Sequence, residues 1–176
     1  MKHEELSQLM KALAFAAHKH RNLRRKDAAK TPYINHPIAL ANILVNEGGI
    51  TDLDVICAAL LHDTIEDTET TEQELREAFG VAIAGMVAEV TDDKRLAKAE
   101  RKARQVEHAP SLSTGAKLVK LADKIANLRD ILEAPPDWPD ERKREYFAWA
   151  NKVIDGLRGV HAELELVFDQ TYERRS

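Results

Sequence analysis

The sequence predicts an all-α fold, a single compact domain of about nine helices that spans residues 1–176. Apolar residues recur at spacings of three and four almost throughout the chain, which is the period of an amphipathic helix. The 7 glycines and 6 prolines gather at a few points and therefore separate the helical segments. A chain of 176 residues with 44% hydrophobic content suits one core, and no segment shows a convincing strand pattern.

The individual helices follow from capping residues and from the distribution of apolar side chains. Pro37 suits the first position of a helix, where its missing N–H costs nothing. Thr51 and Thr71 are expected N-caps, the second with Glu74 three residues later as a capping box. The run Val55–Leu61 is apolar on every side, which predicts a buried helix. In chain order, the expected helices cover residues 4–21, 37–47, 52–66, 71–79, 81–90, 95–108, 114–133, 139–156 and 160–174.

Glycine and proline mark the expected ends of these helices. Glycine adopts the left-handed conformation that closes many helices, and proline cannot continue one. Between such points the segment 114–133 is strongly amphipathic, with an apolar stripe along one side. The stripe consists of Leu118, Leu121, Ala122, Ile125 and Leu128. The residues that predict helix ends or interruptions are Gly48, Gly49, Gly80, Pro110, Pro135 and Pro136.

Charge and composition exclude several classes of protein. The 26 basic and 30 acidic side chains give a net charge of -4, which argues against general nucleic-acid binding. The longest apolar run, Val55–Leu61, is too short for a bilayer, and the N-terminus lacks a signal-peptide core. We therefore expect a cytoplasmic protein that contacts neither membranes nor nucleic acids. Cys57 is the only cysteine, and its apolar neighbours predict an inert core thiol.

The end of the expected helix 52–66 carries a cluster of polar residues. His62, Asp63, Glu66 and Asp67 stand at i, i+1, i+4 and i+5, which places them on one flank of a helix at about 100° per residue. Three carboxylates within one turn repel one another unless a cation or a basic ligand offsets their charge. This pattern favours a divalent-metal site. A solvated acidic helix end is the alternative that the cluster alone leaves open.

Two distant residues add to this cluster. His36 lies between Pro32 and Pro37, which restrict the backbone around it. Asp123 stands at the margin of the apolar stripe in 114–133. Each residue has an ordinary alternative, because a single histidine at a helix start is commonly a cap or a surface residue. Asp123 could likewise pair with Lys120 one turn earlier.

Together these segments resemble the HD phosphohydrolase superfamily, in which a His, a His-Asp pair and a distant Asp recur. More closely, the chain is similar to the hydrolase domain of RelA/SpoT enzymes and to the stand-alone SpoT-like (metazoan SpoT homologue type) ppGpp hydrolases. The resemblance covers nearly the whole chain and weakens after about Gly156. The matching stretches are Arg24–Lys26, Thr31–Pro37, Ala58–Thr68, Val90–Lys94, Gly115–Lys124, Asn127–Arg129 and Glu145–Phe147.

The resemblance implies an HD-domain helical fold with Mn²⁺ held by four ligands. Two imidazoles and two carboxylates suit Mn²⁺ but also accept Fe²⁺ or Zn²⁺, so the choice of metal comes from the resemblance. The four implied ligands are His36, His62, Asp63 and Asp123. A divalent ion at such a site lowers the pKa of a water and stabilises charge on phosphoryl oxygens.

The resemblance also implies the catalytic and substrate-binding residues. Glu66 and Asp67 match the catalytic Glu-Asp pair, one acting on the attacking water and the other on the leaving 3′ oxygen, with the division of roles left open. A highly anionic nucleotide needs cations that the metal ligands do not supply. The expected substrate contacts are Arg25, Lys26, Lys98, Asn127, Arg142 and Tyr146.

The leading functional hypothesis is Mn²⁺-dependent removal of the 3′-pyrophosphate from ppGpp or pppGpp, which returns GDP or GTP. A second hypothesis is removal of the 2′-phosphate of NADPH at the same metal site, an activity of members of the stand-alone group. A third is a non-catalytic HD domain that senses nucleotides, although such domains usually lose the residues that this chain keeps. In each case the expected partner is a small nucleotide, and the sequence does not predict the oligomeric state.

Overall fold

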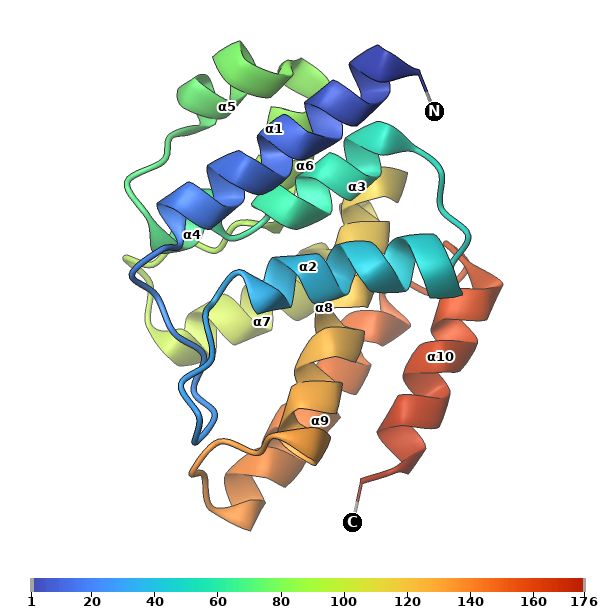
Figure 1. Ribbon diagram of the computed structural model, residues 1–176. Coiled ribbons are helices and arrows are strands. Elements are labelled where there is room, and N and C mark those ends of the chain that lie inside the picture. Colours follow the sequence, from blue (N-terminus) through green and yellow to red (C-terminus); the bar gives the residue numbers. More distant parts are fainter. Residues whose placement is uncertain (1, 176) are drawn as a thin grey trace.

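A computed structural model describes residues 2–175, which form helices joined by short loops (Figure 1). Between residues 2 and 175 there is no strand, and the predicted all-α fold is confirmed. Two isolated β-bridges join Arg24 to Pro32 and Asp27 to Pro136. The elements are α1 (His3–Lys19), α2 (Asn35–Asn42), the π-helix η1 (Ile43–Glu47), α3 (Leu53–Leu61), α4 (Thr64–Asp67), α5 (Glu72–Phe79), α6 (Val81–Val90), α7 (Lys98–His108), the 3₁₀-helix η2 (Ala109–Ser111), α8 (Thr114–Glu133), α9 (Asp140–Asp155) and α10 (Ala162–Glu173).

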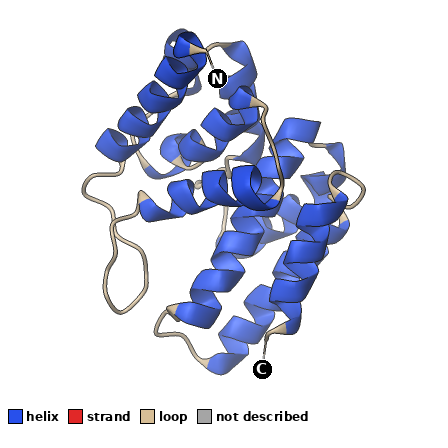
Figure 2. Ribbon diagram, turned by 45° about the vertical axis from the view of Figure 1, so that its right-hand side comes forward, coloured by secondary structure: helices blue, strands red, loops and turns tan. Residues whose placement is uncertain are grey.

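Helix α3 lies in the core, and all of its residues from Val55 to Leu61 are buried. Helices α1, α2, α6 and α8 pack against it. The long helix α8 passes behind α2 in Figure 1 and also contacts α6, α9 and α10. Figure 2 shows the same helices after a 45° turn, with the loops confined to their ends. No helix within residues 2–175 is long and apolar enough to cross a membrane.

The predicted continuous helix 52–66 is wrong, because the chain breaks at His62 and Asp63. Helix α3 ends at Leu61, and the short helix α4 begins at Thr64. Asp63 has φ −99° and ψ 0°, which is the bridge region between helical and extended backbone. The buried hydroxyl of Thr64 donates a hydrogen bond of 2.7 Å to the carbonyl oxygen of Leu61 and so satisfies the end of α3. His62 and Asp63 therefore occupy a turn, and the predicted placing of His62, Asp63, Glu66 and Asp67 on one flank of a helix does not hold.

The helix predicted to begin at Pro37 begins two residues earlier, at Asn35. His36 therefore lies in the first turn of α2, and the end of the predicted segment is the π-helix η1. The predicted end at Gly48 is correct, since Gly48 caps η1 and Gly49 has a positive φ of 61°.

Two predicted caps differ in detail. Asp52, one residue after the expected Thr51, caps α3 by accepting hydrogen bonds from the backbone N–H groups of Asp54 and Val55. Thr71 caps α5 as predicted, but the structure gives no reciprocal bond from Glu74 within the described residues. The carboxylate of Glu74 instead contacts Lys19 at 3.0 Å. Long-range ion pairing thus competes with a local capping box.

Candidate active site

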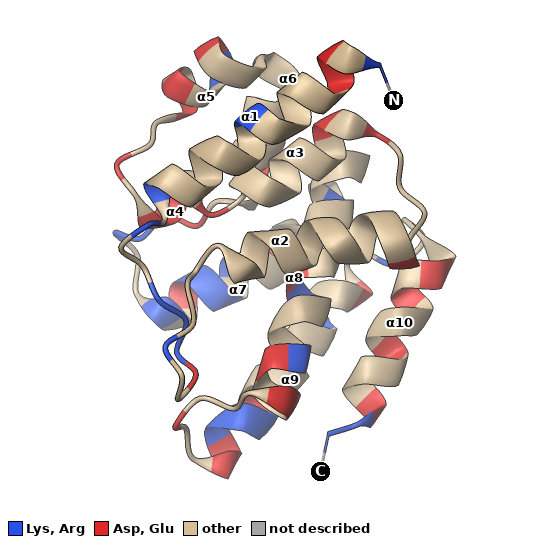
Figure 3. Cartoon of the chain, in the orientation of Figure 1, with Lys and Arg blue, Asp and Glu red and all other residues tan. Residues whose placement is uncertain are grey.

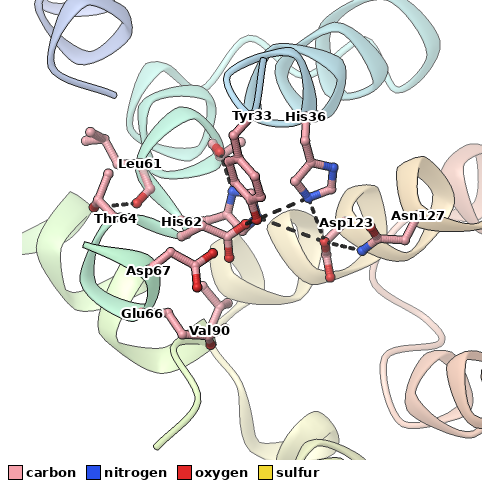
Figure 4. Close-up of polar contacts among 12 residues, drawn as sticks. Tyr33, His36, Leu61, His62, Thr64, Glu66, Asp67, Val90, Asp123 and Asn127 are labelled. Atoms are coloured by element: carbon pink, nitrogen blue, oxygen red, sulfur yellow. Dashed lines mark hydrogen bonds and ion pairs between the residues drawn. The ribbon is translucent and has the colours of Figure 1, made fainter. Parts of the chain in front are cut away.

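Four side chains from three separate segments meet beside α8 (Figure 4). Nε2 of His36, from α2, lies 3.2 Å from Oδ1 of Asp123 on α8. Nε2 of His62 lies 2.9 Å from Oδ2 of Asp63 and 3.9 Å from Oδ1 of Asp123. His36 and Asp63 complete the group at 3.9 Å. Ligand atoms that share one ion at ~2.0–2.2 Å have comparable mutual separations, so the arrangement fits a mononuclear site.

The tautomer of His62 is set by the preceding helix. Its Nδ1 lies 2.8 Å from the carbonyl oxygen of Ala59, so Nδ1–H donates and the lone pair is on Nε2. This Nε2 is buried, faces Oδ2 of Asp63 at 2.9 Å and makes no well-aligned hydrogen bond within residues 2–175. Burial opposes the charged form, but the carboxylate of Asp63 outweighs it and raises the pKa of His62 to about 9. At neutral pH a proton therefore occupies Nε2, and a bound metal ion would replace this proton.

Asp123 is held by two residues of its own helix. The amide Nδ2 of Asn127 donates to Oδ1 at 2.7 Å, and the ammonium of Lys124 donates to Oδ2 at 3.1 Å. Burial disfavours charge on Asp123, yet Lys124 and His36 hold its pKa well below the usual range. The alternative partner Lys120 points elsewhere and donates to the carbonyl oxygen of Val90 at 3.1 Å. Asp123 is thus kept ionised and directed at the two histidines.

Asp63 has a partner that the sequence analysis did not assign. The hydroxyl of Tyr33 donates to Oδ2 of Asp63 at 2.5 Å. Burial and then Asp63 raise the pKa of Tyr33, so the phenol stays protonated and acts as the donor. Although burial opposes its charge, the pKa of Asp63 lies below its ordinary value because His62 and His36 are close. The available signal was an aromatic residue three positions before His36.

Glu66 and Asp67 lie next to this group, and one oxygen of each lies within 4.8 Å of an oxygen of Asp63. Oε1 of Glu66 accepts a hydrogen bond of 2.8 Å from the backbone N–H of Asp92. Burial and the charge of Asp63 raise the pKa of Glu66 to about 7. Asp67 forms an ion pair with Lys94, a residue that the sequence analysis placed in a motif without a role.

A cavity of about 950 Å³ opens beside these residues. It is lined by His36, Glu66 and Asp67 and by four of the predicted substrate contacts. These four are Arg25, Lys26, Asn127 and Tyr146. Three further residues that line the cavity were not predicted as substrate contacts: Lys94, Arg101 and Trp138.

Lys98 and Arg142, the other two predicted contacts, do not line this cavity. Lys98 is close enough to Lys26 and Arg101, which line the cavity, to feel their charges. Burial and then the charges of Arg142, Lys26 and Arg101 lower the pKa of Lys98. The guanidinium of Arg142 sits 4.1 Å from the ring centre of Trp138, which does line the cavity. Figure 3 shows the basic segments of the α1–α2 loop, α7 and α9 around one side of the molecule. The cavity is therefore lined by basic side chains, among them Arg25, Lys26 and Lys94, together with carboxylates such as Glu66 and Asp130.

Arg25 is positioned by a hairpin-like loop. Its backbone N–H donates to the carbonyl oxygen of Thr31 at 2.9 Å, next to the β-bridge between Arg24 and Pro32. Its Nη2 donates to Oδ1 of Asn127 at 3.0 Å, so Asn127 connects Arg25 to Asp123. The amide group of Asn127 is thus engaged at both ends, and its contact with a nucleotide stays a prediction.

Comparisons with known proteins agree with the motifs. The family model described as "HD domain" matches residues 12–150. Guanosine-3′,5′-bis(diphosphate) 3′-pyrophosphohydrolase MESH1 of Mus musculus is 56% identical over 172 residues, which are 97% of this chain and 96% of the relative. The Homo sapiens protein of the same name is 54% identical over 172 residues, with the same two shares of 97% and 96%.

A solved structure described as a metazoan ortholog of SpoT that hydrolyzes ppGpp superposes with a TM-score of 0.93. Its sequence is 49% identical, and the match covers 96% of each chain. The resemblance stated from the motifs is thereby confirmed. Because the family model covers most of the chain and the relatives match it almost end to end, the protein belongs to the HD-domain family.

Proposed function

We propose that the protein hydrolyses the 3′-pyrophosphate of ppGpp and pppGpp and releases GDP or GTP with pyrophosphate. The observation that carries this proposal is the group formed by His36, His62, Asp63 and Asp123. His36 also lines the adjacent cavity, where basic side chains such as Arg25 and Lys26 are available to an anionic substrate. Relatives with the corresponding printed activity match nearly the whole chain. We also propose that residues 1–176 act as one HD hydrolase domain, because α8 contacts helices from both halves of the chain.

Membership in the HD-domain family implies a divalent metal ion, and the four side chains fit one. The fit follows from the buried Nε2 of His62, which makes no well-aligned hydrogen bond within residues 2–175 and faces carboxylate oxygens of Asp63 at 2.9 Å and of Asp123 at 3.9 Å. When bound, the ion would supply Lewis-acid stabilisation of charge on the phosphoryl oxygens. We propose Mn²⁺, because a mixed set of nitrogen and oxygen donors suits it, with Fe²⁺ or Zn²⁺ as substitutes.

The structure favours different roles for Glu66 and Asp67. A carboxyl whose pKa is raised to about 7 exchanges a proton near neutral pH, as a general base requires. One oxygen of Glu66 is held by the N–H of Asp92, which leaves the other for a proton from the attacking water. Asp67 is paired with Lys94, which lines the cavity and whose ammonium would offset the negative charge of the 3′-pyrophosphate under attack.

The cations of the cavity would bind the phosphates of the substrate. Arg25 and Lys26 line the cavity, and Arg25 is fixed close to the metal group through Asn127. Lys98 and Arg142 approach the same region and would contact more distant phosphates. Tyr146 also lines the cavity, and its ring would pack against the ribose or the base.

The deciding experiment compares ppGpp and NADPH as substrates of the purified protein with Mn²⁺ in the buffer. We expect GDP and pyrophosphate from ppGpp, at a higher kcat/KM than phosphate release from NADPH. The Asp63→Ala variant is the background control. Negligible turnover of ppGpp beside efficient turnover of NADPH would replace the proposed substrate. A protein that neither contains nor takes up a divalent ion would instead support the non-catalytic hypothesis.

A further inference from the structure

The hydroxyl of Tyr33 contacts the one oxygen of Asp63 that faces the histidines. Oδ2 of Asp63 accepts the hydrogen bond from Tyr33 at 2.5 Å and lies 2.9 Å from Nε2 of His62. The same oxygen lies 3.9 Å from Nε2 of His36. Figure 4 shows Tyr33, from the loop before α2, and His36, from the first turn of α2, directed toward His62 and Asp123. The phenol therefore acts on the carboxylate oxygen nearest the proposed ion.

Tyr33 is itself held in place by residues outside the metal group. Its ring stacks on the imidazole of His20, with centroids 5.0 Å apart and planes 28° apart. His20 is only 1% exposed, and its Nδ1 lies 2.9 Å from the carbonyl oxygen of Ala16 on α1. The backbone N–H of Tyr33 donates to the carbonyl oxygen of Leu23 at 3.1 Å. The position of the hydroxyl is thus set by α1 and by the loop that follows it.

Two of the other proposed ligands are held by hydrogen bonds with groups outside the metal group. Asp123 receives hydrogen bonds from Asn127 and Lys124, and His62 donates to the carbonyl oxygen of Ala59. His36 lies in the first turn of α2 and contacts Asp123 through Nε2, while its buried Nδ1 has no hydrogen-bond partner within residues 2–175. For Asp63, the side chain contacts His62, itself a proposed ligand, and within residues 2–175 it accepts a hydrogen bond from one residue outside the metal group, Tyr33. Asp63 also sits in the turn between α3 and α4, where no regular helix fixes its backbone.

We propose that Tyr33 is a positioning residue that orients Asp63 for binding of the divalent ion. This inference rests on the metal site of the proposed function, and it assigns no contact with the reacting atoms to Tyr33. A hydrogen bond to a ligating carboxylate restricts rotation of that side chain, so the carboxylate is already held in one orientation when the ion binds. Loss of such outer partners typically weakens metal affinity by about 10–100-fold.

The test is the Tyr33→Phe variant, which keeps the ring that stacks on His20 and removes only the hydroxyl. Mn²⁺ binding without nucleotide is measured by equilibrium dialysis of protein stripped with a chelator. We expect the Kd for Mn²⁺ to rise about tenfold. The activity on ppGpp should be lost at limiting Mn²⁺ and recovered at saturating Mn²⁺, with an unchanged KM for ppGpp.

Tyr172→Phe is the matched control, because Tyr172 lies on α10 and packs against Phe168 and Phe147, away from the metal group. Its Kd for Mn²⁺ should equal that of the wild type. The melting temperature of both variants without metal reports on any purely structural effect.

An unchanged Kd for Mn²⁺ in Tyr33→Phe overturns the inference, whatever happens to the melting temperature. A raised KM for ppGpp with an unchanged Kd for Mn²⁺ also overturns it, because the hydroxyl would then act on the substrate. Wild-type protein that binds no Mn²⁺ overturns it as well. Wild-type protein that binds Mn²⁺ without hydrolysing ppGpp contradicts only the proposed function. In that case the Kd for Mn²⁺ of Tyr33→Phe still decides the role of Tyr33.

Discussion

Nη2 of Arg25 lies 2.5 Å from Oδ2 of Asp130, which is 105 residues further along the chain. Both side chains line the cavity, so the arginine proposed to bind phosphate is ion-paired before substrate arrives. Burial opposes the charge on Arg25, but Asp130 raises the pKa of Arg25 above its ordinary value. A substrate phosphate must therefore compete with Asp130 for the guanidinium.

Replacing Arg25 with alanine should raise the KM for ppGpp by about tenfold or more, because a charge-assisted contact with phosphate is lost. Steady-state kinetics at saturating Mn²⁺ measure this value. Arg76→Ala is a suitable control, since Arg76 pairs with Glu72 on the surface of α5 and does not line the cavity. An unchanged KM in Arg25→Ala would place this residue outside the phosphate site.

Replacing Asp130 with alanine should have the opposite effect and lower the KM for ppGpp by about two- to fivefold, because the competing carboxylate is removed. The expected change is modest because the side chain of Asp130 is 48% exposed and water screens the ion pair. The same kinetic assay measures it. A higher KM would show that Asp130 chiefly holds Arg25 in position.

Asp63→Ala and Glu66→Ala should separate metal binding from proton transfer. We expect Asp63→Ala to lose both bound metal and turnover, because two histidines and one carboxylate remain. Glu66→Ala should retain the metal and lose about 10²–10⁴-fold in kcat, the usual contribution of a general base. Metal content and kcat measured on the same preparations provide the comparison. Turnover by Asp63→Ala would contradict its role as a ligand.

Without metal, the protein should lose stability as the pH rises from 7 to about 9. The pKa of His62 is raised to about 9 in the folded protein, against ~6.5 in the unfolded chain. Protonated His62 therefore contributes its full share to the free energy of unfolding below pH ~6.5, and this share is lost as the pH rises through the folded pKa. Between pH 7 and 9 the loss is on the order of 2 kcal/mol. Urea unfolding with a chelator at pH 7, 8 and 9 measures this loss.

His62→Gln should show a much smaller slope between pH 7 and 9, because it has no proton to release there. Apparent Mn²⁺ affinity of the wild type should increase over the same interval, since the ion displaces the proton of His62. Stability that does not change with pH in chelated wild-type protein would contradict the raised pKa.

Thr64→Val should destabilise the protein by about 1–2 kcal/mol, because the carbonyl of Leu61 loses its hydrogen-bond donor in a buried place. Thr64 is fully buried, and valine has nearly the same shape. Thr171→Val on α10 is the matched control, since its hydroxyl donates to the carbonyl of Val167 one turn earlier in a regular helix. Urea unfolding should show a smaller loss for the control. Mn²⁺ affinity should fall only in Thr64→Val, because only Thr64 supports the turn with His62 and Asp63.

The sequence alone determined the all-α class, most helix positions and the family. These properties depend on local features: apolar periodicity, capping residues such as Thr71, and motifs such as Ala58–Thr68 that carry the resemblance to the family. The roles of the predicted site residues stay predictions, although the structure brings all four proposed ligands together. Spacing within one helix was a wrong argument for placing His62, Asp63, Glu66 and Asp67 on one flank, because the chain turns at His62 and Asp63.

Only the tertiary structure decided which distant side chains touch. The bonds from Tyr33 to Asp63 and from Arg25 to Asp130 span 30 and 105 residues, and the pairing of Lys94 with Asp67 spans 27. No local pattern specifies these contacts, because they depend on how α2, α3 and α8 pack against one another and on the course of the loops between them. Periodicity along a chain identifies the buried side of each helix, whereas the packing of those sides fixes the positions of the polar groups at their margins.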